Sequence, residues 1–120
     1  MLEEARRKAC RLGVSVSLHH GDAARPPLPH ASFDVVLGRH VFWALPDPAG
    51  ALAHWIALLR PQGRLALIEG RWMTGVGLPA ADCTALLRLH REEARLQVLD
   101  DRALWGRAIT DERYLLLSRR

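Results

Sequence analysis

The sequence predicts an α/β protein with a mostly parallel sheet whose last strand runs antiparallel. Helix-like and strand-like patterns alternate along most of the 120 residues. Only the last two strand-like segments lack a helix between them, and strands joined without a crossover run antiparallel. A chain of this length is expected to form one domain around one core.

The opening stretch, MLEEARRKACRLG, has the pattern of an amphipathic helix. Its apolar residues recur at three- and four-residue spacing: Leu2, Ala5, Ala9 and Leu12. Gly13 is a typical helix terminator. The stretch lacks the apolar centre of a secretory signal and the acid-poor composition of a transit peptide, so a domain helix is expected.

Two strands are expected next, with a loop between them. Residues 14–20, VSVSLHH, alternate apolar and polar side chains, which predicts a strand with one buried face. The proline-rich residues 23–32 predict a loop. Residues 33–38, FDVVLG, form a short apolar run typical of a strand inside a parallel sheet.

A helix is expected to follow Asp47, which can cap it, with Pro48 in the first turn. Pro61 and Gly63 are expected to stop this helix. The next segment, RLALIEG at residues 64–70, predicts a third strand.

The last part of the chain predicts a helix and two strands. Residues 79–94 carry Cys83, Leu86, Leu87 and His90 at helical spacing. RLQVLDD then predicts a fourth strand, and DERYLLLSRR a fifth strand that ends the chain.

Composition excludes several classes of protein. The net charge of +4 comes from arginines scattered along the chain, which favours a solvated surface over a nucleic-acid site. No apolar run approaches the roughly 20 residues that span a bilayer. A soluble protein is therefore expected. Cys10 and Cys83 lack a partner motif, so neither a disulfide framework nor a zinc site is expected, and a reducing, cytoplasmic setting is.

Ligands of an open parallel sheet collect at the carboxyl ends of its strands. Asp22 follows the first predicted strand, beside Gly21, whose backbone a ligand can approach closely. Its carboxylate can accept a hydrogen bond from an amino group, as on adenine, while the Ala23 N–H donates to a ring nitrogen. The alternative is that Asp22 caps a turn.

Three stretches resemble, in order and spacing, class I S-adenosylmethionine-dependent methyltransferases of the small-molecule, methyltransferase type 11-like kind. They are GDA, PLPHASFDVVLGRHVFWALPDP and LLRPQGRLALIEG. The closing DERYLLLSRR is similar to the last antiparallel strand of that fold. The resemblance implies a three-layer α/β/α Rossmann-like methyltransferase fold, S-adenosylmethionine as cofactor and a small-molecule acceptor.

The resemblance also implies roles for single residues. Asp22 falls where the family binds the adenine amino group, and Ala23 where the backbone meets the ring. Gly38 and Arg39 follow the strand against which the methionine part of the cofactor lies. His40 is the candidate catalytic base, since it titrates near neutral pH. The alternative is a structural histidine, because many methyl transfers need only proximity and alignment.

The other histidines and the tryptophans suggest less. His19 and His20 are adjacent on a predicted strand and point to opposite faces, so no metal site is expected. Trp43 and Trp55 are expected in the core or a pocket wall. Trp72, in a glycine-rich loop, is the tryptophan best placed to cover a substrate.

The family's glycine-rich turn and the acid that holds the ribose hydroxyls are not found. MLEEARRKA resembles the helix after the family's second strand, with Met1 at the position of that family's methionine. Residues 1–120 are therefore expected to be one N-terminally truncated, partial methyltransferase domain with low cofactor affinity by itself.

In the family's sheet order, 3-2-1-4-5-7-6, the missing strands fall between residues 14–20 and residues 33–38. Their absence leaves two open sheet edges, which can pair with each other or with another chain, or leave a poor folded state. An alternative function follows: a non-catalytic interaction module or pseudoenzyme that dimerises through these edges.

Overall fold

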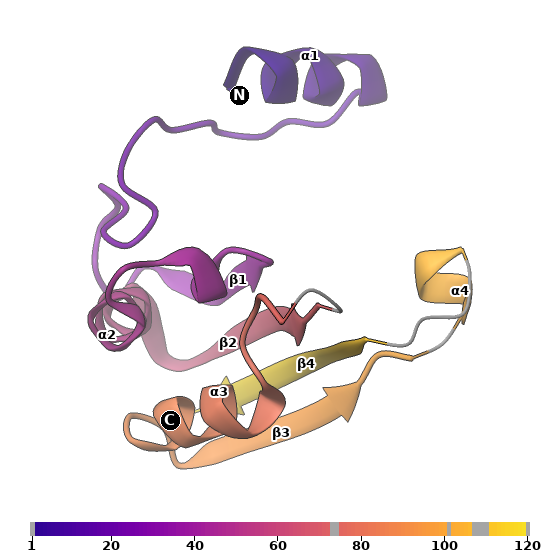
Figure 1. Cartoon of the computed structure of the whole chain (residues 1–120). Coiled ribbons are helices and arrows are strands. Elements are labelled where there is room, and N and C mark those ends of the chain that lie inside the picture. The colour runs from indigo at the N-terminus through magenta and orange to yellow at the C-terminus, as the bar shows by residue number, and fades with distance from the viewer. Residues whose placement is uncertain (1, 73–74, 101, 107–110, 120) are drawn as a thin grey trace.

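The computed structural model describes residues 2–72, 75–100, 102–106 and 111–119. These residues contain a four-stranded sheet with the strand order β1-β2-β4-β3 (Figure 1). The elements along the chain are α1 (Leu2–Leu12), β1 (Phe33–Arg39), the 3-10 helix η1 (Phe42–Ala44), α2 (Pro48–Ala57), β2 (Leu59–Arg71), α3 (Ala80–Arg88), β3 (Glu93–Val98), α4 (Arg102–Trp105) and β4 (Glu112–Arg119).

The strand directions confirm the predicted antiparallel last strand in a sheet whose other described strands run in one direction. β1 pairs parallel with β2, and β4 pairs antiparallel with both β2 and β3. Three strands therefore run in one direction and only the last strand opposes them. The order β1-β2-β4-β3 corresponds to the 4-5-7-6 part of the predicted family order.

One face of the sheet carries the core. Residues opposite each other in register, such as Leu67 and Leu116, point to the same face. They pack with α2, α3 and the turn after β1 into one cluster: Phe42, Leu52, Trp55, Leu59, Leu65, Leu67, Cys83, Leu87, Tyr114 and Leu116. Alternate residues of β1 point to the other face, where Val35 is 55% and Leu37 62% exposed. The described helices that contribute to the core thus form one layer.

Helix α2 begins as the sequence predicts. Asp47 is its cap and accepts a hydrogen bond from the Gly50 N–H at 3.1 Å, and Pro48 occupies the first turn. The predicted stop at Pro61 and Gly63 is wrong, because the helix ends at Ala57 and both residues lie in β2. The chain leaves the helix early because Leu58 is buried and its carbonyl accepts the Phe33 N–H at 3.0 Å.

The strand predicted at residues 14–20 is also wrong. These residues form no regular element, and Val14 and Val16 are 52% and 57% exposed. Alternating side chains favour a strand only where a neighbouring strand completes the backbone hydrogen bonds, and none of the described strands pairs with this segment. Helix α1 forms as predicted, but it lies apart from the sheet and buries no residue within the described part of the chain (Figure 1).

The helix predicted over residues 79–94 is shorter in the structure. Helix α3 ends at Arg88, and His90 lies in the turn that follows. The reason is Arg91, whose buried side chain donates to the Gly63 carbonyl at 2.9 Å and to Ser118 in β4. The chain turns inward at Arg91 and enters β3 at Glu93.

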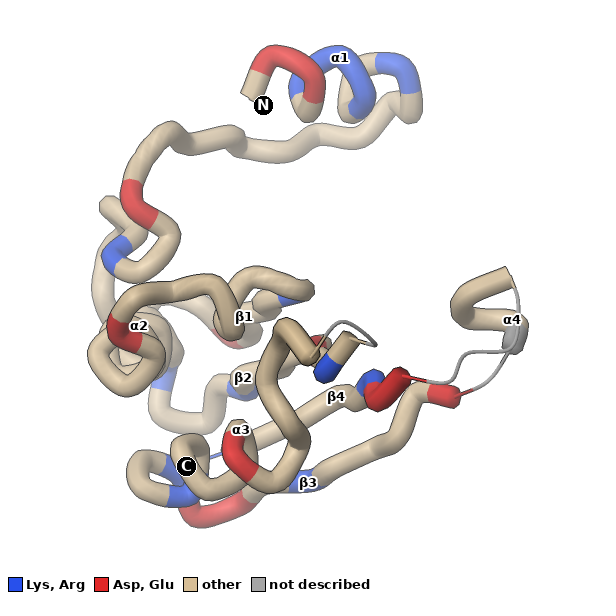
Figure 2. Tube along the Cα trace, viewed as in Figure 1, with Lys and Arg blue, Asp and Glu red and all other residues tan. Residues whose placement is uncertain are grey.

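The basic residues are less evenly scattered than the sequence analysis expected, because several of them lie in α1. Figure 2 shows basic residues concentrated along α1 and otherwise spread over the chain. Within the described residues, no helix combines the length and the apolar character that a membrane crossing needs.

The core assignment predicts a contrast between two leucines. Leu116 is fully buried in β4, so Leu116→Ala should lower the free energy of unfolding by about 2–5 kcal/mol. Leu89 is 77% exposed and serves as the matched control. Leu89→Ala should change the free energy of unfolding by less than about 0.5 kcal/mol. Urea denaturation measures both, and equal losses would contradict the assigned core.

Candidate functional site

The lining of one cavity brings together three of the four predicted cofactor-binding residues, Ala23, Gly38 and Arg39. The cavity has a volume of about 360 Å³. It runs along β1 and the loop before it, and its walls are largely apolar. The described residues that line it are Ala23, Pro26, Leu28, Phe33, Val35, Val36, Leu37, Gly38, Arg39, Val41, Trp55 and Leu58.

Asp22, the fourth predicted residue, lies next to this lining in the chain. Its side chain is exposed, and its Oδ1 accepts a hydrogen bond from the Ala24 N–H at 2.9 Å. This geometry is that of the turn-capping alternative. Asp22 is not among the residues that line the cavity, although its neighbour Ala23 is.

Trp55 of α2 fixes the cavity wall. Its indole Nε1–H donates to the Ala23 carbonyl at 2.8 Å, and the residue is only 5% exposed. A Cβ atom at Gly38 would approach the Trp55 ring to 3.3 Å, so glycine lets β1 pack closely against this ring. Trp55 therefore serves both the core and the pocket wall, and the hydrogen bond to Ala23 is the part that the sequence did not predict.

Glu69 of β2 holds the turn after β1. It is fully buried, and its Oε1 accepts a hydrogen bond from the Phe42 N–H at 2.8 Å, at the start of η1. Its Oε2 has no hydrogen-bond partner among the described residues. Burial raises the pKa of this carboxyl, and the N–H groups of Phe42, Val41 and Trp43 oppose that effect.

His40 is the residue that this turn presents. It has a left-handed backbone with φ of 55°, which is uncommon for a residue other than glycine. Its N–H donates to the Ile68 carbonyl of β2 at 2.9 Å. Burial lowers the pKa of the imidazole, and the positive charges of Arg39 and Arg113 lower it further.

The His40 ring belongs to a cluster of four side chains from different parts of the chain, here called the ring cluster: His40, Trp72, Trp105 and Arg113. The ring centroids of His40 and Trp72 are 5.0 Å apart at an interplanar angle of 72°. His40 and Trp105 are nearly parallel, with centroids 6.3 Å apart and an angle of 17°. The Arg113 guanidinium lies 4.2 Å from the Trp105 centroid and 5.4 Å from that of Trp72.

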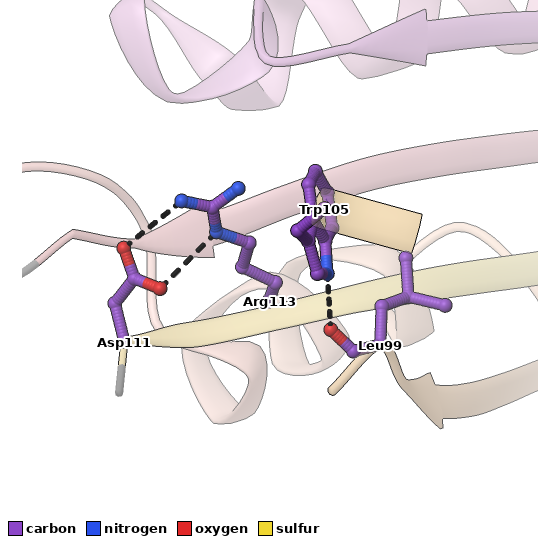
Figure 3. Close-up of polar contacts among 4 residues, drawn as sticks. All are labelled: Leu99, Trp105, Asp111 and Arg113. Atoms are coloured by element: carbon purple, nitrogen blue, oxygen red, sulfur yellow. Dashed lines mark hydrogen bonds and ion pairs between the residues drawn. The ribbon is translucent and has the colours of Figure 1, made fainter. Parts of the chain in front are cut away.

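Two further contacts hold the ring cluster in place (Figure 3). Asp111 accepts two hydrogen bonds from Arg113, one at Nε (3.1 Å) and one at Nη2 (3.2 Å). The Trp105 Nε1–H donates to the Leu99 carbonyl at 2.8 Å. A bidentate arrangement of this kind fixes the plane of a guanidinium group.

The sequence analysis expected Trp72 to cover a substrate, but it did not identify Trp105 and Arg113 as neighbours of His40. Arg113 reaches the cluster because it lies opposite Gly70 in the β2–β4 register. That register joins residues more than forty positions apart, so only the order of strands in the sheet could have indicated it. The described residues contain no group of three or more side chains arranged to hold a metal ion.

Residues 1–67, more than half of the chain, match the family described as "Methyltransferase domain", and the chain belongs to this family. Over 76 residues it is 43% identical to aklanonic acid methyltransferase DauC of Streptomyces sp. strain C5, which covers 62% of this chain and 34% of that protein. Over 69 residues it is 42% identical to a demethylmenaquinone methyltransferase of Deinococcus radiodurans, covering 58% and 29%. The chain thus spans about a third of the length of these curated relatives.

Solved structures share the fold. The [4+2]-cyclase SpnF superposes with a TM-score of 0.81 at 18% identity, over 99% of this chain and 62% of that one. A possible histamine N-methyltransferase of Thermotoga maritima gives 0.70 at 19% identity, over 98% and 70%. The sheet is therefore that of a Rossmann-like methyltransferase fold, as the resemblance implied.

The raised pKa of Glu69 predicts a pH effect on stability. The folded state favours the protonated carboxyl, so this group's stabilising contribution is complete below the unfolded pKa and falls as pH rises toward the folded pKa. Glu69→Gln keeps an oxygen that accepts the Phe42 N–H but cannot titrate. It should therefore reduce the loss of stability at pH values above 4.5, the ordinary pKa of the carboxyl.

Urea denaturation at a series of pH values measures the effect of Glu69→Gln. Glu4→Gln is the matched control, since Glu4 is an exposed acid on α1. Identical pH profiles for the wild type and Glu69→Gln would contradict the role of the buried carboxyl.

Proposed function

We propose that residues 1–120 are a partial methyltransferase domain that binds S-adenosylmethionine and takes part in methyl transfer to a small-molecule acceptor. The observation that carries the proposal is the cavity along β1, which brings Ala23, Gly38 and Arg39 into one wall. Family membership supports it, as do neighbours crystallised with S-adenosylhomocysteine, such as an N1-methyltransferase of Burkholderia thailandensis and CalH.

The cavity fits the adenine end of this cofactor. A volume of about 360 Å³ lies within the range of small-molecule sites. Leu28, Val36 and Trp55 offer apolar surface to a flat ring, and the exposed carboxylate of Asp22, the residue before Ala23, is the group proposed to bind the adenine amino group. When bound, the cofactor supplies a methyl group activated by a sulfonium centre.

The same cavity offers little to the ribose and the amino-acid end. No acidic side chain stands among the described residues of its wall, so the ribose hydroxyls and the ammonium group find no carboxylate there. At this end of the cofactor, Gly38 would allow close approach of the backbone and Arg39 would supply positive charge, in place of paired hydrogen bonds. This supports weak binding by the chain as it stands, in line with a partial domain.

A small-molecule acceptor in the cytoplasm fits the remaining observations. The two curated relatives are named for aklanonic acid and demethylmenaquinone, and neither name refers to a nucleic acid. The basic residues outside α1 are scattered, which does not favour a nucleic-acid surface. Cys10 and Cys83 are free thiols, as expected in a reducing compartment.

The open edge of β1 favours one further function, self-association. β1 is an edge strand. The His40 N–H donates to β2, and the backbone N–H and C=O groups of successive residues point alternately to the two sides of a strand. The backbone groups of Val35, Leu37 and Arg39 therefore point away from β2. Val35 and Leu37 add exposed apolar side chains along this edge. A second copy of the chain can add a strand here, making an interaction module of the same domain.

Titration calorimetry with S-adenosylmethionine tests the enzymatic proposal. We expect binding in the millimolar range, and a roughly tenfold loss in Asp22→Asn, since a hydrogen bond to a charged group contributes about 1.5–3 kcal/mol. Asp34→Asn, at an exposed acid on β1, should bind like the wild type. No heat at millimolar cofactor, or equal losses in both variants, would refute the assigned adenine site.

Light scattering after size-exclusion chromatography tests self-association. Leu37→Lys places a charge on the open β1 edge and should shift dimers to monomers. Leu96→Lys, on the opposite edge strand β3 at a side chain 49% exposed, should leave the dimer intact. A wild type that is monomeric at all concentrations, or equal dissociation by both variants, would argue against an interface at β1.

A further inference from the structure

The sheet has a second face, opposite the core, on which α2 and α3 do not pack. Residues paired across strands share a face, and on this side they form rows that run from β1 through β2 and β4. The first, second and third rows begin at Val35, Leu37 and Arg39. The apolar members of these rows are here called the open face: Val35, Leu37, Ala66, Ile68, Leu115 and Leu117.

The open face presents apolar side chains to solvent. Val35 is 55% and Leu37 62% exposed, and Ile68, Leu115 and Leu117 are half-buried. None of the open-face residues belongs to the core cluster or to the side chains packed against that cluster. Helix α1 buries no residue within the described part of the chain, so it does not pack here. Contiguous apolar surface of this kind marks an interaction site.

Arginines border the open face. Arg64 of β2 and Arg119 of β4 lie in the first row, Arg95 of β3 ends the second row, and Arg39 begins the third. Glu93 of β3, opposite Arg119, is the acidic residue in these rows. The border therefore carries an excess of positive charge around an apolar centre.

The apolar centre has the dimensions of a helix. Its residues come from the neighbouring strands β1, β2 and β4, which span about 10 Å at the usual strand spacing. An α-helix with its side chains is about 10–12 Å wide. Successive rows are about 7 Å apart, close to the rise of about 6 Å between residues i and i+4 of a helix. A helix with an apolar stripe therefore fits this face, as helices commonly pack on sheets.

The charges at the border decide which helix fits. A helix with acidic residues beside its apolar stripe places carboxylates near the arginines. Helix α1 of a second copy also has an apolar stripe, but its Arg6, Arg7, Lys8 and Arg11 would be repelled by the border. The rows contain no aromatic side chain, on which the bases of a single-stranded nucleic acid would stack.

We propose that the open face is a docking surface for an acidic amphipathic helix supplied by another protein. Apolar side chains of that helix would contact Ala66, Ile68 and Leu117, and its acidic flanks would pair with Arg64 and Arg95. Val35, Leu37 and Arg39 also line the cavity along β1, whereas the residues on β2, β3 and β4 do not. The variants that test the surface are therefore chosen outside the cavity.

A labelled model peptide of about 18 residues, with leucines along one helical stripe and glutamates beside it, is the probe. Fluorescence anisotropy with the 120-residue chain should give a micromolar dissociation constant at about 50 mM NaCl. Raising NaCl to about 500 mM should weaken binding at least tenfold, because salt screens the arginines. The same peptide with lysines in place of the glutamates should not bind.

Two pairs of variants locate the binding surface. Arg95→Glu should weaken peptide binding about fivefold, because an ion pair is lost and a repulsion replaces it. Arg88→Glu makes the same charge change at an exposed residue of α3, on the core side of the sheet, and should bind like the wild type. Leu117→Ala should also weaken binding about fivefold, whereas Leu89→Ala, at a side chain 77% exposed, should not.

The proposal is wrong if the lysine peptide binds as tightly as the glutamate peptide, or if Arg95→Glu and Arg88→Glu weaken binding equally. It is also wrong if the glutamate peptide does not bind while Arg95→Glu abolishes another association of the chain. Light scattering then identifies a second copy as the occupant, and co-sedimentation with phosphatidylserine vesicles or a titration with single-stranded RNA identifies a membrane or a nucleic acid. No cofactor is present, so the outcome is independent of the S-adenosylmethionine titration.

Discussion

The hydrogen bond between the buried Glu69 carboxylate and the Phe42 N–H connects the main parts of this molecule. Glu69 lies in the second half of β2, and Phe42 begins the 3-10 turn after β1. Phe42 itself is a core residue, so the turn is fixed from the core and from β2 at once. His40, two residues earlier, is thereby held in a backbone conformation that it would rarely adopt unaided.

The position of β1 at the edge of the sheet explains both the cavity and the open surface beside it. Residues from both faces of β1, such as Val36 and Leu37, line the cavity, so it follows the strand's edge. Trp55 closes one side by binding the Ala23 carbonyl. In the family's sheet order another strand occupies this edge. The same edge of β1 is therefore open to pairing with a further strand.

Sequence reasoning succeeded where the signals were local. The Asp47 cap, the strands at the positions of β1 and β2 and the antiparallel last strand follow from patterns within a few residues. It failed where contacts between residues far apart in the sequence determine the structure. Residues 14–20 alternate like a strand but have no strand partner, and α3 stops early because Arg91 reaches Gly63 and Ser118. Ala23, Gly38 and Arg39, which the resemblance implied as cofactor-binding residues, line one cavity, whereas the position of Arg113 beside Trp72 depends on the β2–β4 register.

Cofactor binding at the β1 cavity is the central claim, and an amide chemical-shift titration of the labelled chain with S-adenosylmethionine tests it most directly. The largest shifts are expected at Ala23, Gly38 and Arg39, and a smaller one at the Trp55 indole N–H that anchors this wall. The β3 residues, at the opposite edge of the sheet, should not move. Shifts spread evenly over the chain, or confined to α1, would contradict the claim.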